Sequence, residues 1–135
     1  MKLRWKILLV IGLGAAWFWA SNAWGQSRRI DLKKYYVGYN EDYFDNTLPD
    51  IPVVWGNLSS QNWLGVTFLK EDGTPREIVI DRYAHPYPRQ ALQTLQHEMC
   101  HVSLRGEPDG VDSHGPKHEA CMLRLAEKGA MHGIW

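Results

Sequence analysis

The sequence has few cysteines and no excess of charge of either sign. Its 135 residues include two cysteines, Cys100 and Cys121, too few for a disulfide framework or a four-cysteine zinc site. Fifteen basic residues balance fifteen acidic ones, and the chain has no basic cluster, so direct binding to nucleic acid is not expected. Nothing in the composition indicates disorder, a fibre or a repeat array. The chain therefore fits a single globular domain, and the sequence leaves its oligomeric state open.

The N-terminal segment differs from the rest of the chain. Basic residues at positions 2, 4 and 6 precede an uncharged, largely apolar run, and Ser21-Asn22-Ala23 places small residues where a signal peptidase reads them. This layout predicts a signal peptide over 1–23. A retained membrane anchor, which could extend to 27, is the alternative, because the 21 uncharged residues 7–27 are enough to span a bilayer core of about 30 Å. Both readings predict a membrane-anchored or secreted (periplasmic) protein rather than a cytoplasmic one.

Residues 28–135 are predicted to form one α+β domain. The order is a helix, three strands, a helix, a loop and a helix, which differs from the alternating pattern of a doubly wound sheet. Asp31 can cap the first helix, and Asp72-Gly73 favours a hairpin between the second and third strands. Helices are predicted at 32–46, 88–104 and 116–129, and strands at 51–55, 63–69 and 77–81.

The segment His97-Glu98-Met99-Cys100-His101 carries the strongest chemical signal. His97 and His101 lie four residues apart on the predicted helix, so both imidazoles can reach one ion, and Zn²⁺ suits them. Zinc lowers the pKa of a water molecule that it binds, and Glu98 could take the proton as general base and later pass it to the leaving amine. The pattern predicts a zinc metallopeptidase of the HExxH type with one ion per chain. A solvated helix face that happens to carry two histidines is the alternative.

A catalytic zinc site needs a third protein ligand besides its open position. His114 precedes a glycine, which lets the chain approach an ion and turn, and Pro116 can then open the next helix. His118 lies on the apolar face of that helix, where a packed core histidine is the commoner case. The nearer candidates are His114, His118 and Glu119, and the more distant ones are His85 and His132.

The whole set of motifs resembles the SprT-like family of zinc metalloproteases. The resemblance rests on Asn40, Phe44, Leu48-Pro49, Val53-Val54-Trp55, Gly65, Ile78-Val79-Ile80, Thr94 to His101 and His114-Gly115-Pro116. It implies a small zincin-like α+β domain with a metal cleft between sheet and helices. It also implies zinc ligation by His97, His101 and His114, with Glu98 catalytic. The chain departs from the family at His118, where an aromatic residue is usual, in its leader, and in lacking a C-terminal zinc ribbon.

The leading functional hypothesis is a zinc-dependent endopeptidase of the cell envelope that cuts unfolded or exposed polypeptide. An edge strand in such enzymes can hold the substrate backbone by β-addition, and residues 63–69 are the candidate strand. One alternative is a non-catalytic zinc-binding domain, which Glu98 argues against. Another is a membrane-tethered protease associated with DNA, which the lack of a basic cluster argues against.

The two cysteines are expected to be free and buried. Cysteine packs as a small hydrophobic residue, and buried free thiols are the commoner state. Cys100 lies on the helix of the metal motif and Cys121 on the following helix, so a bridge between them is the alternative. It would require Cα atoms within about 7 Å of each other.

Overall fold

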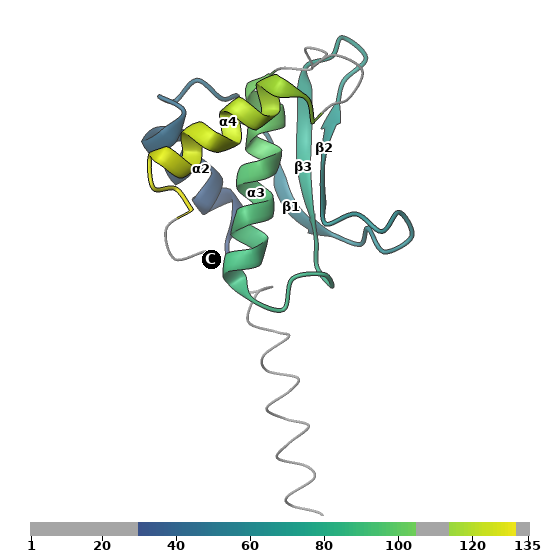
Figure 1. The fold of residues 1–135 in the computed structure, drawn as a ribbon. Helices are drawn as coiled ribbons and strands as arrows, with labels where there is room; N and C mark the ends of the chain where they lie inside the picture. Colours follow the sequence, from purple (N-terminus) through teal and green to yellow (C-terminus); the bar gives the residue numbers. More distant parts are fainter. Residues whose placement is uncertain (1–29, 105–113, 132–135) are drawn as a thin grey trace, which may run out of the picture.

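The fold is a three-stranded sheet with three helices packed on one of its sides, as seen in a computed structural model that describes residues 30–104 and 114–131 (Figure 1). In this part of the chain the elements are α2 (Leu32–Tyr43), β1 (Val53–Gly56), β2 (Gly65–Leu69), β3 (Pro75–Asp81), α3 (Pro88–Ser103) and α4 (Pro116–Glu127). Both the α+β class and the order of elements agree with the prediction.

Helix α2 begins where the sequence predicts and ends earlier. The Asp31 side chain accepts a hydrogen bond from the N–H of Lys34, which caps the helix. The helix ends at Tyr43 because Asp45 and Asn46 adopt left-handed backbone angles, with φ of 55° and 57°. Aspartate and asparagine tolerate this conformation better than most residues, and it cannot continue a right-handed helix.

The sheet has the order β1-β3-β2, with β3 at its centre. Strands β2 and β3 form the predicted antiparallel hairpin, and Gly73 in the turn has a positive φ of 82°. Strand β1 pairs with β3 in parallel, which the sequence did not predict. Consequently β2 pairs with the sheet on one side only within the described residues, and it is an edge strand.

Helix α3 is the central helix of the domain and lies against the sheet, with α2 and α4 beside it (Figure 1). Pro88 occupies its first turn, and the Gln90 side chain accepts a hydrogen bond from the N–H of Tyr87. One side of the helix is fully buried. The core that it completes contains Tyr36, Ile78, Ile80, Ala91, Leu95, Met99, Val102 and Leu125.

A disulfide joins α3 to α4. Cys100 and Cys121 are both buried, their sulfurs are bonded at 2.08 Å, and their Cα atoms lie 5.8 Å apart. The expectation of free thiols is therefore wrong. The two cysteines face each other across the helix interface, where a bridge needs no backbone movement.

Removing this disulfide is expected to lower the free energy of unfolding by about 3 kcal/mol, because the bridge restricts the unfolded chain over a loop of 21 residues. Guanidinium unfolding of Cys100→Ala/Cys121→Ala beside the wild type measures the loss. Wild-type protein in reductant should shift toward the variant, while the variant itself should not respond. Equal unfolding midpoints for the two proteins would contradict the expectation.

The predicted location of the protein requires correction. No helix in the ranges 30–104 and 114–131 is long and apolar enough to cross a bilayer. The described residues therefore give no support to the predicted membrane-anchored or secreted location. The predicted signal peptide or anchor at 1–27 lies outside the described residues, as does the distant ligand candidate His132.

Candidate metal centre

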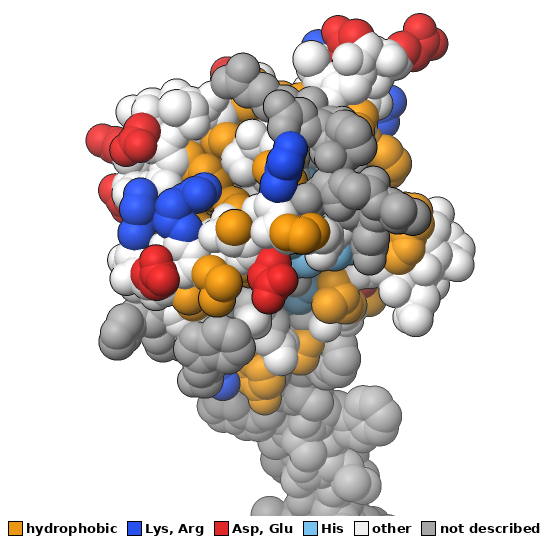
Figure 2. All heavy atoms as spheres, turned by 45° about the horizontal axis from the view of Figure 1, so that its top comes forward, with side chains coloured by type: hydrophobic (Ala, Val, Ile, Leu, Met, Phe, Trp, Pro, Cys, Tyr) orange, Lys and Arg blue, Asp and Glu red, His pale blue; other side chains and the backbone are white. Residues whose placement is uncertain are grey.

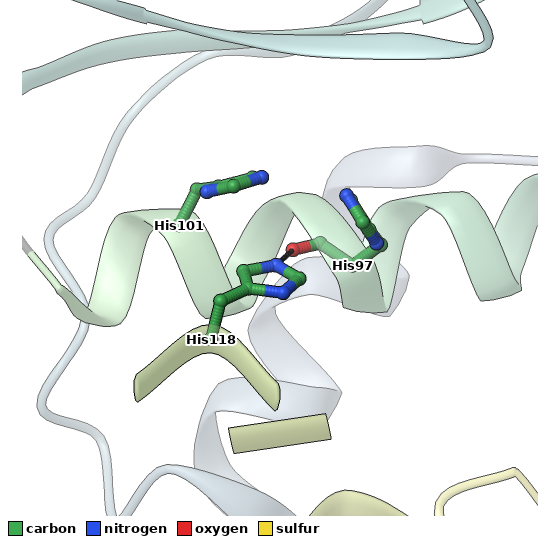
Figure 3. Close-up of side chains that lie close together, drawn as sticks. All are labelled: His97, His101 and His118. Atoms are coloured by element: carbon green, nitrogen blue, oxygen red, sulfur yellow. Dashed lines mark hydrogen bonds between the residues drawn. The ribbon is translucent and has the colours of Figure 1, made fainter. Parts of the chain in front are cut away.

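The two histidines of the helix motif project from the same face of α3 (Figure 3). Their ring centroids lie 5.1 Å apart with the rings edge to face. Both residues are half-buried, and the opposite face of α3 is anchored in the core by Leu95, Met99 and Val102. The predicted i, i+4 pair is therefore present on a rigid helix, which suits a metal site.

His114 brings a third imidazole to this pair from the residues just before α4. Its Nε2 atom lies 3.0 Å from Nε2 of His97 and 3.2 Å from Nε2 of His101. Tetrahedral coordination at the usual Zn–N distance separates ligand nitrogens by about 3.3–3.4 Å. A neutral imidazole has one N–H, so Nε2 of His114 cannot hydrogen-bond to both facing nitrogens at once. A cation between the three nitrogens would accept a lone pair from each. The three side chains thus fit a zinc ion.

His118 offers a second combination with the same two histidines. The ligand atoms of His97, His101 and His118 lie within 4.8 Å of one another, so this group too could hold a metal ion. However, Nε2 of His118 lies 3.1 Å from the main-chain oxygen of His97, to which it donates (Figure 3). The shorter nitrogen–nitrogen distances favour His114 as the third ligand.

His118 instead has the surroundings of a packed histidine. It is buried on α4, and its ring centroid lies 4.1 Å from that of His101 and 4.4 Å from that of His97. It therefore packs against both rings, and its hydrogen bond to the His97 main-chain oxygen joins α4 to α3. Packing of this kind fixes the orientation of metal-binding imidazoles.

The other ligand candidates lie elsewhere or are exposed. His85 is buried between the main-chain oxygen of Asp81 and the hydroxyl of Thr94, each 2.8 Å from one of its ring nitrogens. Both nitrogens are thus engaged in joining the end of β3 to α3. Glu119 is exposed on the first turn of α4 and belongs to no candidate metal group in the described residues.

Glu98 is buried beside the histidines, with 5% of its surface exposed. Its Oε2 atom accepts a hydrogen bond of 2.7 Å from the hydroxyl of Thr67 on β2. Burial raises the pKa of Glu98, and the Thr67 hydrogen bond partly opposes this shift. The carboxyl group is thus suited to exchange a proton close to the imidazole cluster.

Burial keeps both helix histidines neutral. Desolvation lowers the pKa of His97 to about 4 and that of His101 to about 3, and repulsion from His118 adds to each shift. Neutral imidazole is the form that binds metal ions. Both helix histidines are therefore in their metal-binding form at neutral pH.

The metal-free protein is expected to lose stability as the pH falls from 6.5 toward about 4. In the unfolded chain both histidines regain the ordinary value of 6.5, so over this range the unfolded state binds more protons than the folded state. Above pH 6.5 this effect is absent. Thermal unfolding midpoints between pH 7.5 and 4.5 test it, and His97→Gln/His101→Gln should give a flatter profile. Identical profiles would contradict the expectation.

The histidine side chains reach the surface on one face of the molecule (Figure 2). In this view hydrophobic side chains lie on both sides of them. Histidine side chains are thus part of the surface on this face.

Comparison with known protein families gives a match. The model of the SprT-like family matches residues 32–132, which is most of the chain and includes all the helices and strands that the structure describes. A search of curated proteins found no match.

Proposed function

Since the chain belongs to the SprT-like family, we propose that it is a zinc-dependent endopeptidase. The observation that carries the proposal is the convergence of three imidazole nitrogens next to one buried carboxyl group. Three histidine ligands leave one position open in a tetrahedral site, as catalytic zinc requires. A purely structural site has no need of a buried acid beside that position.

Each residue has a distinct part in the proposed reaction. His97, His101 and His114 would hold the ion, which supplies Lewis acidity toward the attacking water and the scissile carbonyl. Glu98 takes a proton from that water and later delivers it to the leaving amine. Its burial keeps bulk water away from the carboxyl group and strengthens its interactions with the reacting groups.

We propose a polypeptide substrate held along β2. Among the described residues this strand is at the edge of the sheet, and it contacts α3, where its Thr67 side chain meets Glu98 next to His97. An extended peptide could pair with this edge through main-chain hydrogen bonds, which demand little from the substrate's side chains. Trp63, Leu64 and Leu69 are exposed at the two ends of the strand and could contact apolar substrate residues.

Zinc removal and return is the direct test of this function. The full chain should bind one equivalent of zinc and cleave a casein-type substrate. A strong chelator should abolish cleavage, and one equivalent of zinc should restore it. Stoichiometric zinc binding without any hydrolysis would instead identify a non-catalytic zinc domain.

A further inference from the structure

The structure assigns Thr67 as the positioning residue for the Glu98 carboxylate. This inference rests on the proposed peptidase function and extends it to a residue outside the helix motif. Thr67 lies in the middle of β2, and 31 residues separate it from Glu98. The two side chains meet because β2 packs against α3.

The contact is short and involves an ionisable acceptor. The Thr67 hydroxyl lies 2.7 Å from Oε2 of Glu98 and 3.2 Å from the main-chain oxygen of the same residue. A hydroxyl has only one proton to donate. The carboxylate oxygen is the closer and the stronger of the two acceptors, so the proton points to it. Both possible acceptors belong to Glu98, so this hydroxyl ties β2 to that residue and to no other.

A glycine allows β2 to approach the helix closely enough for this contact. A Cβ atom at Gly65 would lie 2.7 Å from Cγ2 of Thr94 and 3.3 Å from Cγ of Glu98, so a larger residue would force either the strand or these side chains to shift. Residues two apart on a strand point to the same side, which places Gly65 and Thr67 together on the face toward α3. Glycine at position 65 thus leaves room for the close approach of β2 to α3 at which the Thr67 hydroxyl reaches Glu98.

The hydrogen bond controls which carboxylate oxygen is available. The last torsion of a glutamate side chain has a broad energy profile, so a buried carboxylate without a partner can rotate. With Oε2 held by Thr67, the other oxygen is left to accept a proton from the attacking water. Misplacement of a reacting group by about 1 Å can cost about 10²-fold in rate.

Substitutions at position 67 separate the hydroxyl from the rest of the side chain. Thr67→Val keeps the shape and the strand preference but removes the hydroxyl, and it should lower kcat about 10-fold to 100-fold with little change in KM or zinc content. Thr67→Ser keeps the hydroxyl and should restore most of the rate. Thr74→Val is the matched control, because that exposed hydroxyl on the same hairpin contacts only Asp72. It should leave the rate unchanged.

A double variant tests whether Thr67 acts through Glu98. In a Glu98→Gln background, Thr67→Val should cause no further loss, since residues that act as a unit are not additive. A second readout needs neither zinc nor substrate. The ¹³C carboxyl resonance of Glu98 in metal-free protein, identified by its absence in Glu98→Gln, should shift in Thr67→Val and stay near the wild-type position in Thr67→Ser.

Three results would overturn the inference: a wild-type rate in Thr67→Val, a rate in Thr67→Ser as low as in Thr67→Val, or an equal loss from Thr67→Val with and without Glu98. An inactive wild-type protein that binds zinc would reject the proposed function instead. In that case an unshifted resonance in Thr67→Val would also reject the contact between Thr67 and Glu98, and a shifted one would retain it.

Discussion

Replacing Glu98 with glutamine is expected to lower hydrolysis by a factor of about 10²–10⁴ while zinc stays bound and the fold is retained. An amide cannot take the proton of the attacking water, so the chemical step loses its base. The ligands are untouched, and the amide oxygen can still accept the hydrogen bond from Thr67. Because burial disfavours the charged form of Glu98, the neutral amide should not reduce stability.

Rates of peptide cleavage, zinc content and thermal unfolding should be measured together for this variant. Glu119→Gln is the matched control, since it makes the same change at an exposed position on α4. The control should keep the wild-type rate. A wild-type rate in Glu98→Gln would rule out the proposed mechanism, whereas loss of zinc from that variant would show that Glu98 is itself a ligand.

Replacing His114 with alanine is expected to weaken zinc binding by at least about two orders of magnitude, because one of three ligands is lost. His118→Ala should keep one equivalent of zinc and weaken binding less. That variant removes the packing behind two imidazoles and the donor to the main-chain oxygen of His97, but no proposed ligand.

Competition with a chromophoric chelator measures both affinities, and thermal unfolding reports the stability that each variant loses. His118 is buried and His114 is exposed, so alanine at 118 should cost more stability and alanine at 114 more affinity. The reverse result for zinc, full binding in His114→Ala and loss in His118→Ala, would make His118 the third ligand.

Local features of this protein could be predicted from the sequence because their causes are local. The i, i+4 spacing of His97 and His101 defines one helix face, whatever the helix packs against. The turn between β2 and β3 follows from Asp72-Gly73, and the starts of α3 and α4 follow from Pro88 and Pro116. The end of α2 was predicted too late because it depends on two left-handed residues that are not glycine.

The cysteine prediction failed for a different reason. Cys100 and Cys121 are 21 residues apart, and nothing in their neighbours indicates whether the two helices place them within reach of each other. Buried free cysteine is the commoner state, so it was the expectation. The distance between the helices, which tertiary packing sets, decides the matter.

By itself the sequence determined the α+β order of elements, the helix that carries the metal motif and the chemistry that histidine and glutamate can perform there. Only the tertiary structure decided that β1 pairs in parallel with β3, which leaves β2 at the edge beside α3. The tertiary structure also decided that His114 approaches the two histidines of α3 and that Thr67 meets Glu98. The physical reason is range: a helix face or a turn depends on residues a few positions apart, whereas these contacts join segments 13 to 31 residues apart and exist only once the whole core has packed.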